Sequence, residues 1–243
     1  SVSVVDLATG DVRETLTGRH AAGLAVSPDG RHVVCANAAA DTLSILDAAS
    51  GGLVETVWTK RTPAELFGAA PNALVFAPDG RRLYACNGSQ NAVAVIDWDP
   101  DDRGGTRLAG LIPVGWYPGA IAFDADRRQL VVANLRGLPE QGKLRGETPT
   151  YNSHQHHGSL SLVPVPDDAD LPALSETVAR NLRSAAIERA LLPPRQGVAP
   201  RAIPERIGEP SLIEHVVYVI KENRTYDQVL GDMPRGDGFP ELC

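Results

Sequence analysis

Short apolar segments separated by turn residues follow one another through the first two-thirds of the chain. Residues 73–76 (ALVF) and 82–85 (RLYA) are typical, since both are rich in residues that favour strands. Between them stands Pro78-Asp79-Gly80, where the proline fixes φ and the glycine accepts a positive φ, so that the chain reverses tightly. The pattern predicts about thirteen antiparallel strands, joined mainly by hairpins, over residues 1–166.

These segments belong to an internal repeat. Residues 23–57 align with residues 73–100, and a weaker third copy covers residues 120–137. The spacing of about 50 residues is typical of a four-stranded propeller blade. A last strand is expected at 158–166. Thirteen strands make a little over three blades, whereas closed propellers have about 4–8, so the sequence predicts a mainly β fold that is part of a propeller ring.

Certain polar residues and cysteines recur with the repeat. We expect the recurring residues to form local hydrogen bonds in hairpins rather than to bind a ligand; they are Asp6, Asp47, Asp97, Asn37, Asn87 and Asn134. Cys35 lies two residues before an asparagine and Cys86 only one. Their side chains should therefore point to opposite faces, which disfavours a disulfide between them and favours two small buried apolar groups.

The repeats "SPDGRHVVCAN…DTLSILD" and "APDGRRLYACN…NAVAVID" resemble the YVTN family of β-propeller repeats. The resemblance covers residues 1–166 and implies a propeller, without indicating what that propeller binds. In the third copy, Asp124-Ala125-Asp126-Arg127 replaces the Pro-Asp-Gly turn, so we expect a looser connection there. The strand expected at the very start of the chain suggests that the sequence begins inside a longer protein.

A long polar segment, residues 136–158, interrupts the third copy and contains His154, His156 and His157. Imidazoles this close together could bind a transition metal. A solvated surface loop explains them equally well, because no second group of ligands accompanies them. A loop of this length could also shape the entrance of a propeller.

Residues 168–192 change to a helical period and end at Pro193-Pro194, which cannot continue a helix. We expect Ser175, Arg180 and Arg183 on the exposed face of this helix. The proline-rich stretch 193–210 predicts an extended linker. Residues 167–210 therefore form a helix and linker between two domains.

The segment 213–220 is almost entirely apolar and predicts a strand covered by helices on both faces, the first strand of an incomplete α/β domain over 211–243. Thr225 and Gln228 predict a capping box for a short helix that ends near Gly231. Directly after the strand, Glu222 and Asn223 offer oxygen donors of the kind that divalent cations prefer. A surface ion pair and a turn residue explain the same two positions.

The block Glu222-Asn223-Arg224-Thr225-Tyr226-Asp227 and the apolar stretch before it resemble the start of the bacterial phosphoesterase family of phospholipases C and acid phosphatases, which is similar in fold to alkaline phosphatases. This resemblance implies that Glu222 and Asn223 help to hold a divalent metal ion of unknown identity. It implies supporting roles for Arg224, Thr225 and Asp227. The family's nucleophile and its further Asp and His ligands would lie downstream, so we expect no catalytic residue in the chain and no activity from it alone.

Composition adds little to this picture. The net charge of −7 disfavours nucleic acid as a partner, and no apolar stretch has the length of a membrane helix. We therefore expect part of a metal-dependent phosphoesterase, fused to a propeller and acting on a phosphate ester. The resemblance implies a periplasmic or secreted location. The alternative is a propeller that serves as a binding module or scaffold without being an enzyme.

Overall fold

The computed structural model describes residues 1–62, 65, 68–137, 158–220, 222–236, 238 and 240. The chain divides into two compact units, one of Ser1–Leu138 with Gly158–Ile187 and the other of Pro139–His157 with Glu188–Cys243. The histidines of the long segment, His154, His156 and His157, lie outside the described residues. No helix in the described ranges is both long and apolar enough to cross a lipid bilayer.

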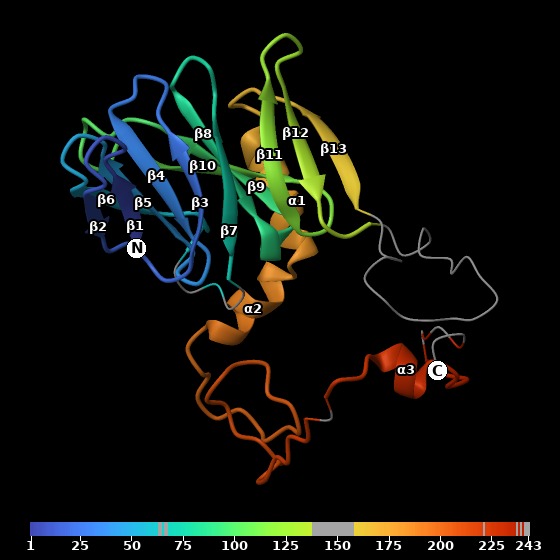
Figure 1. The fold of residues 1–243 in the computed structure, drawn as a ribbon. Helices are drawn as coiled ribbons and strands as arrows, with labels where there is room; N and C mark the ends of the chain where they lie inside the picture. Colours follow the sequence, from blue (N-terminus) through green and yellow to red (C-terminus); the bar gives the residue numbers. More distant parts are fainter. Residues whose placement is uncertain are drawn as a thin grey trace. The chain divides into compact units, whose positions relative to one another are not determined.

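The first unit is a fan of antiparallel sheets, as the sequence predicts (Figure 1). Two sheets have four strands, ordered β3-β4-β5-β6 and β10-β9-β8-β7; a third has the order β11-β12-β13, and β1 pairs with β2. The thirteen strands are β1 (Val2–Val5), β2 (Val12–Thr15), β3 (Ala21–Val26), β4 (His32–Asn37), β5 (Thr42–Asp47), β6 (Leu53–Trp58), β7 (Pro71–Phe76), β8 (Arg82–Asn87), β9 (Ala92–Asp97), β10 (Arg107–Pro113), β11 (Pro118–Asp124), β12 (Gln129–Asn134) and β13 (Ser159–Pro164).

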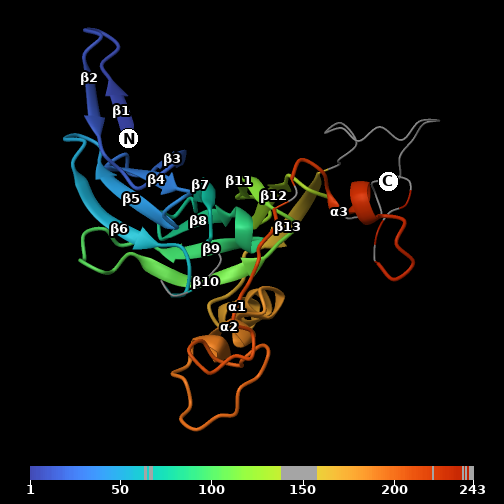
Figure 2. The ribbon, with the colours of Figure 1, turned by 90° about the horizontal axis from the view of Figure 1, so that it is seen from below.

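Successive sheets are related as propeller blades are. The first strands of three sheets, β3, β7 and β11, lie side by side (Figures 1 and 2). We call the sheets β3–β6, β7–β10 and β11–β13 the first, second and third blades. The β1–β2 hairpin corresponds in sequence to the last two strands of a blade. The fold is therefore an open, partial β-propeller of antiparallel blades, which confirms the predicted fold class for this unit.

Burial explains why the middle strands carry the strongest apolar pattern. In β4, β5, β8 and β9 nearly every residue is buried, because both faces of these strands are covered. The second blade lies between the other two, and the first lies between the β1–β2 hairpin and the second. One apolar cluster lies between the first and second blades and a second between the second and third. Cys35 and Cys86 are free, fully buried and in different clusters, as expected.

Adjacent blades are joined by a repeated contact at the start of each inner strand. The residues just before β7 and β11, Ala70 and Tyr117, have φ of +50° and +56°. Asp41 Oδ1 accepts hydrogen bonds from the backbone N–H of Ala70 at 3.1 Å, and Asn91 Oδ1 accepts one from Tyr117 at 3.0 Å. Lys60 forms a buried ion pair with Asp41 at 3.0 Å. Each blade thus fixes the entry of the next.

The recurring polar residues make the local bonds that the sequence predicts. Asn37 donates to Thr42 and Ser44, and the Asp47 carboxylate accepts from the Ser50 backbone. Asp97 differs in the kind of bond, because it forms ion pairs with Arg82 and Arg107, which lie opposite it on the two neighbouring strands. These contacts are still structural ones within hairpins, as expected.

The third hairpin is shorter than the others. Four residues separate β11 from β12, whereas five separate β7 from β8. Arg128 takes the positive φ, +48°, that glycine takes in the other turns, and Asp124 accepts a hydrogen bond from the Arg127 N–H at 3.1 Å. The looser connection expected from the loss of proline and glycine is not found.

Two helices follow the last strand where one was predicted. Helix α1 (Leu171–Asn181) and helix α2 (Ser184–Leu191) are separated at Arg183, whose φ is +55°. Helix α1 packs on the outer strand β10, where Gly110 leaves room for Leu171 and Ser175. Ser175 Oγ accepts a hydrogen bond from the Leu111 N–H at 2.9 Å. We expected this side chain on the exposed face of the helix, but it faces strand β10.

In the second unit, the proline-rich stretch is not an extended linker. Arg201 and Ser211 form a bridge, and the Ile207 N–H bonds back to the Ala190 carbonyl. Arg195 binds both oxygens of the buried Glu209 carboxylate, at 2.7 and 3.0 Å. The stretch therefore folds back on itself, because one bidentate ion pair closes the loop.

The expected strand at 213–220 is not formed, although the helix after it is. Residues 213–220 have no regular secondary structure, and no strand of the described chain pairs with them. A strand needs a neighbour to satisfy its backbone groups, and this segment has none. Helix α3 (Tyr226–Leu230) begins with the predicted capping box of Thr225 and Gln228, and Gly231 is its C-cap.

Candidate functional site

The residues predicted to hold a metal lie in the exposed segment before helix α3. Glu222 is exposed, and Asn223 adopts a φ of +67°, which turns the chain toward the helix. Thr225 Oγ1 accepts a hydrogen bond from the Gln228 N–H, so its role here is to start the helix. Arg224 directly precedes Thr225, and Asp227 lies in the first turn of helix α3. In the described part of the chain, no three His, Cys, Asp or Glu side chains gather in a way that could hold a metal.

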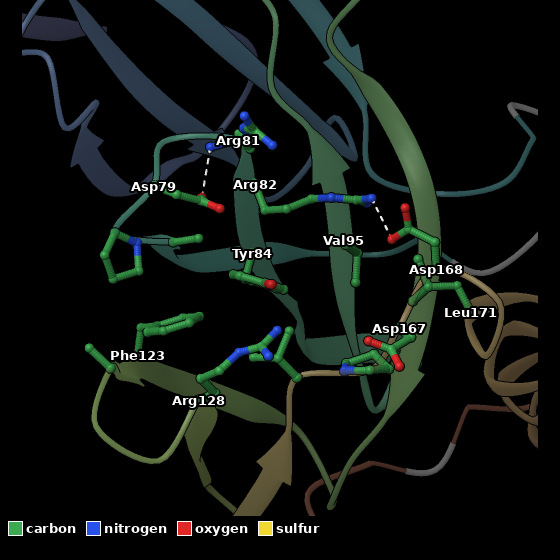
Figure 3. A pocket seen from close by; sticks show the side chains of 15 residues that line it. Asp79, Arg81, Arg82, Tyr84, Val95, Phe123, Arg128, Asp167, Asp168 and Leu171 are labelled. Atoms are coloured by element: carbon green, nitrogen blue, oxygen red, sulfur yellow. Dashed lines mark hydrogen bonds and ion pairs between the residues drawn. The ribbon is translucent and has the colours of Figure 1, made fainter.

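A pocket lies elsewhere, between the second and third blades at the hairpin ends of their strands (Figure 3). Its volume is about 660 Å³. The turn before β8, the turn before β12 and the segment that leads into α1 form its rim. The lining residues are Ala77, Pro78, Asp79, Arg81, Arg82, Tyr84, Val95, Phe123, Ala125, Arg128, Val165, Pro166, Asp167, Asp168 and Leu171.

The pocket lies where the side chain at one repeated position is small. Trp98, the residue after β9, fills the equivalent place between the first and second blades, with edge-on ring contacts to His32 at 5.8 Å and to Phe76 at 4.9 Å. The residue after β13 is Val165. Phe123 corresponds to Phe76 by its pairing in the sheet. The smaller valine therefore leaves space at this junction.

Inside the pocket, an aromatic and aliphatic floor carries one hydroxyl. Tyr84 is only 2% exposed and its ring lies 6.0 Å from that of Phe123. Burial raises the pKa of Tyr84 above its ordinary value, so the hydroxyl remains protonated and can donate a hydrogen bond. Val95 and Leu171 complete the floor.

Ion pairs engage some of the charged residues at the rim. Arg82 contacts Asp97 and Asp168, each at 2.7 Å. Asp79 accepts a hydrogen bond from the Arg81 backbone N–H at 3.0 Å. Within the described residues, the guanidinium groups of Arg81 and Arg128 form no ion pair. In the first blade the equivalent Arg31 is bound by Asp29 at 2.8 Å and by Asp101 at 2.7 Å.

Our sequence analysis did not identify this pocket. The signal was nonetheless present in the repeat, because the residue directly after the third strand is Trp98 in the second blade and Val165 in the third. Comparing this position between the two blades would have indicated less filling between the second and third blades. The unpaired state of Arg81 depends on geometry and could not be inferred.

Comparison with known proteins supports the propeller. Residues 2–116 match the model of the family "Lactonase, 7-bladed beta-propeller", a little under half of the chain. This range ends before the segment that we compared with phosphoesterases. No curated protein matches the chain at a significant level.

Several solved structures are similar over about half of the chain. Hydrazine synthase from Kuenenia stuttgartiensis shares 23% identity, covering 51% of this chain and 33% of its own, with a TM-score of 0.39. A protein of unknown function from Desulfotomaculum acetoxidans shares 19% identity, covering 54% and 40%, with a TM-score of 0.43. A putative 6-phosphogluconolactonase from Bacteroides uniformis shares 18% identity, covering 51% and 36%, with a TM-score of 0.43.

The chain spans well under half the length of each of these structures. At these TM-scores the three similarities support no conclusion about its activity. The fold class rests on the blades themselves and on the family match over residues 2–116.

Proposed function

We propose that this chain joins a propeller, residues 1–166, through the helix and linker of 167–210 to the start of a metal-dependent phosphoesterase domain, residues 211–243. One observation carries the proposal. Five consecutive apolar residues, 216–220, are 72–85% exposed and lead directly into the Glu222–Asp227 block. Such exposure is unfavourable for an apolar segment and typical of a core strand without its sheet. The capping box at Thr225 adds support, because it sets a helix directly after the proposed ligands.

Glu222 and Asn223 fit a divalent metal ion in donor type but not in number. A carboxylate and an amide oxygen suit a hard cation, which takes about six oxygen ligands, so these two residues would supply only part of the set. When bound, the metal would polarise a phosphoryl oxygen and activate a nucleophile. Within this chain, Thr225 begins helix α3 and thereby fixes the backbone that carries both ligands. Arg224 and Asp227 would support the same loop.

The substrate would be a phosphate ester, of the phospholipase C or acid phosphatase type, and the protein would act in the periplasm or outside the cell. The test uses the full-length protein, stripped of metal by a chelator and given Mn²⁺, Zn²⁺ or Ca²⁺. p-Nitrophenyl phosphate and bis(p-nitrophenyl) phosphate report monoesterase and diesterase activity. Glu222→Ala and Asn223→Ala should each lower the metal-dependent rate at least about tenfold, as loss of groups at metal sites commonly does.

Glu214→Ala is the matched control, because Glu214 is also exposed and lies in the same segment before the block. Its rate should equal that of the unmodified protein. If the full-length protein hydrolyses neither ester with any of these metals, the phosphoesterase proposal is wrong. It is equally wrong if Glu222→Ala retains full activity at limiting metal.

A second candidate function follows from the family match over residues 2–116: hydrolytic opening of a lactone ring. Its assay is acid release from a panel of small lactones. The two candidates are distinguishable, since lactone hydrolysis in the propeller should be indifferent to Glu222→Ala and to the chelator. A full-length protein active on neither substrate class would favour a propeller that serves only as a binding module or scaffold.

A further inference from the structure

The pocket between the second and third blades contains a tyrosine hydroxyl without a protein partner among the described residues. Tyr84 is 2% exposed, and no residue in the described ranges forms a hydrogen bond with its Oη. The ring is buried while its hydroxyl faces the space of the pocket, so the O–H is free to donate a hydrogen bond to a bound molecule. Figure 3 shows this hydroxyl near the centre of the pocket, where a bound molecule could satisfy it.

The arginines at the pocket lack the carboxylate partners that the equivalent arginine has at the junction between the first and second blades. Arg31 is held by two carboxylates, whereas its counterparts Arg81 and Arg128 have no ion pair among the described residues. The residue that corresponds to Asp101 is Asp168, counted from the ends of β9 and β13, and Asp168 binds Arg82 instead. Arg82 stands where the first blade has His32, and its pairing with Asp168 leaves Arg81 without the carboxylate that holds Arg31.

The carboxylates at the rim are less available than the guanidinium groups. Asp168 is paired with Arg82, and Asp79 is hydrogen-bonded to the backbone of its own turn. Asp167 is the remaining acidic side chain, against two guanidinium groups. In Figure 3 the Arg128 side chain reaches from its turn toward the middle of the pocket.

We propose that this pocket binds a small organic anion, with a carboxylate or phosphate group attached to an apolar body. The Tyr84 hydroxyl donates a hydrogen bond to the anionic group, and Arg128 contributes charge-assisted hydrogen bonds. Arg81 adds positive charge at the rim. The apolar body lies on the ring of Phe123 and on Leu171, in the space that Trp98 occupies at the preceding junction.

The test titrates the purified chain with benzoate and with phenyl phosphate, and follows binding by saturation-transfer NMR and calorimetry. Both anions should bind saturably, and benzylammonium, which has a similar body with the opposite charge, should not. Tyr84→Phe removes only the hydroxyl, and Arg128→Gln only the charge. Each variant should weaken binding at least about tenfold, the loss expected for one hydrogen bond to a charged group.

Val165→Trp is the decisive variant, because it places at this junction the residue that fills the equivalent space at the preceding one. It should abolish binding, while circular dichroism shows the same sheet content. Arg127→Gln is the matched control: Arg127 is next to Arg128, does not line the pocket and pairs with Asp124. Binding by this variant should be unchanged. If Val165→Trp does not fold, Tyr84→Phe and Arg128→Gln decide the question.

Three results would overturn the proposal. One is the absence of saturable binding of either anion at concentrations up to about 10 mM, where even weak sites are occupied. Another is equal binding of benzylammonium, which would show that the guanidinium groups do not select the ligand. The third is undiminished binding by a folded Val165→Trp protein or by both Tyr84→Phe and Arg128→Gln, which would place the anion elsewhere.

Discussion

Trp98 is the residue whose loss should most clearly show how the blades are held together. Its ring is in edge-on contact with His32 of the first blade and Phe76 of the second, at centroid distances of 5.8 and 4.9 Å. Aromatic contacts of this kind contribute about 0.5–1.5 kcal/mol each beyond the area they bury. Trp98→Val removes both contacts and much of the apolar area of a half-buried indole. We expect the free energy of unfolding to fall by about 3 kcal/mol.

Urea denaturation, followed by far-ultraviolet circular dichroism, measures this loss. Trp116→Val is the control, because Trp116 is 49% exposed and its ring contacts Arg136, an exposed contact that contributes at most about 1 kcal/mol. A Trp98→Val protein destabilised by less than about 1 kcal/mol would refute the reasoning. Such a result would mean that the blades can close over the missing ring, and that the open pocket at the next junction does not arise from Val165.

Three further predictions test other contacts. Ser175→Ala should lower the free energy of unfolding by about 1–2 kcal/mol, because it removes the partner of the Leu111 N–H. Ser89 is exposed, so Ser89→Ala should change this free energy little. Equal effects of the two variants in urea denaturation would contradict the role of Ser175. The hydrogen bond with Arg195 lowers the pKa of Glu209 from 4.5 to about 2, so its contribution to the closed loop should be complete above pH 4.5 and lost as the pH falls toward 2. Amide NMR signals of residues 195–212 that keep their dispersion at pH 2 would contradict this, and Glu209→Gln should show the open loop already at pH 6. Burial raises the pKa of Cys86 to about 12, so the folded chain at pH 8 should not react with iodoacetamide at Cys86; rapid labelling there, measured by mass spectrometry of peptides, would show that the second blade opens.

Local patterns predicted the elements whose partners are close in sequence. The strands of each blade pair with their sequence neighbours, so alternation and turn residues were sufficient to find all thirteen. The capping box of Thr225 and Gln228 was predictable for the same reason, since both of its hydrogen bonds form within four residues.

Elements that depend on distant partners were predicted less well. The apolar segment 213–220 has the composition of a core strand, but a strand forms only beside another, and none of the described strands lies there. The stretch 193–210 was expected to be extended from its prolines, yet the Arg195–Glu209 ion pair closes it across fourteen residues of separation. Proline content makes such a stretch locally stiff, but it does not determine whether the stretch folds back. Here the ion pair of the buried Glu209 carboxylate makes it fold back.

The pocket shows how a repeat can carry functional information through its exceptions. Positions that repeat faithfully, such as Asn37, Asn87 and Asn134, have the same structural role in each blade. Each of these side chains donates a hydrogen bond to a polar side chain of its own blade. Where the copies differ, the junctions differ: His32 and Trp98 fill the first junction, while Arg82 and Val165 leave the second one open and polar. A junction needs no cavity for stability, because the atoms that line an empty space lose packing contacts. The open second junction, with Tyr84 and exposed arginines at its edge, is the arrangement expected where a blade junction holds a ligand.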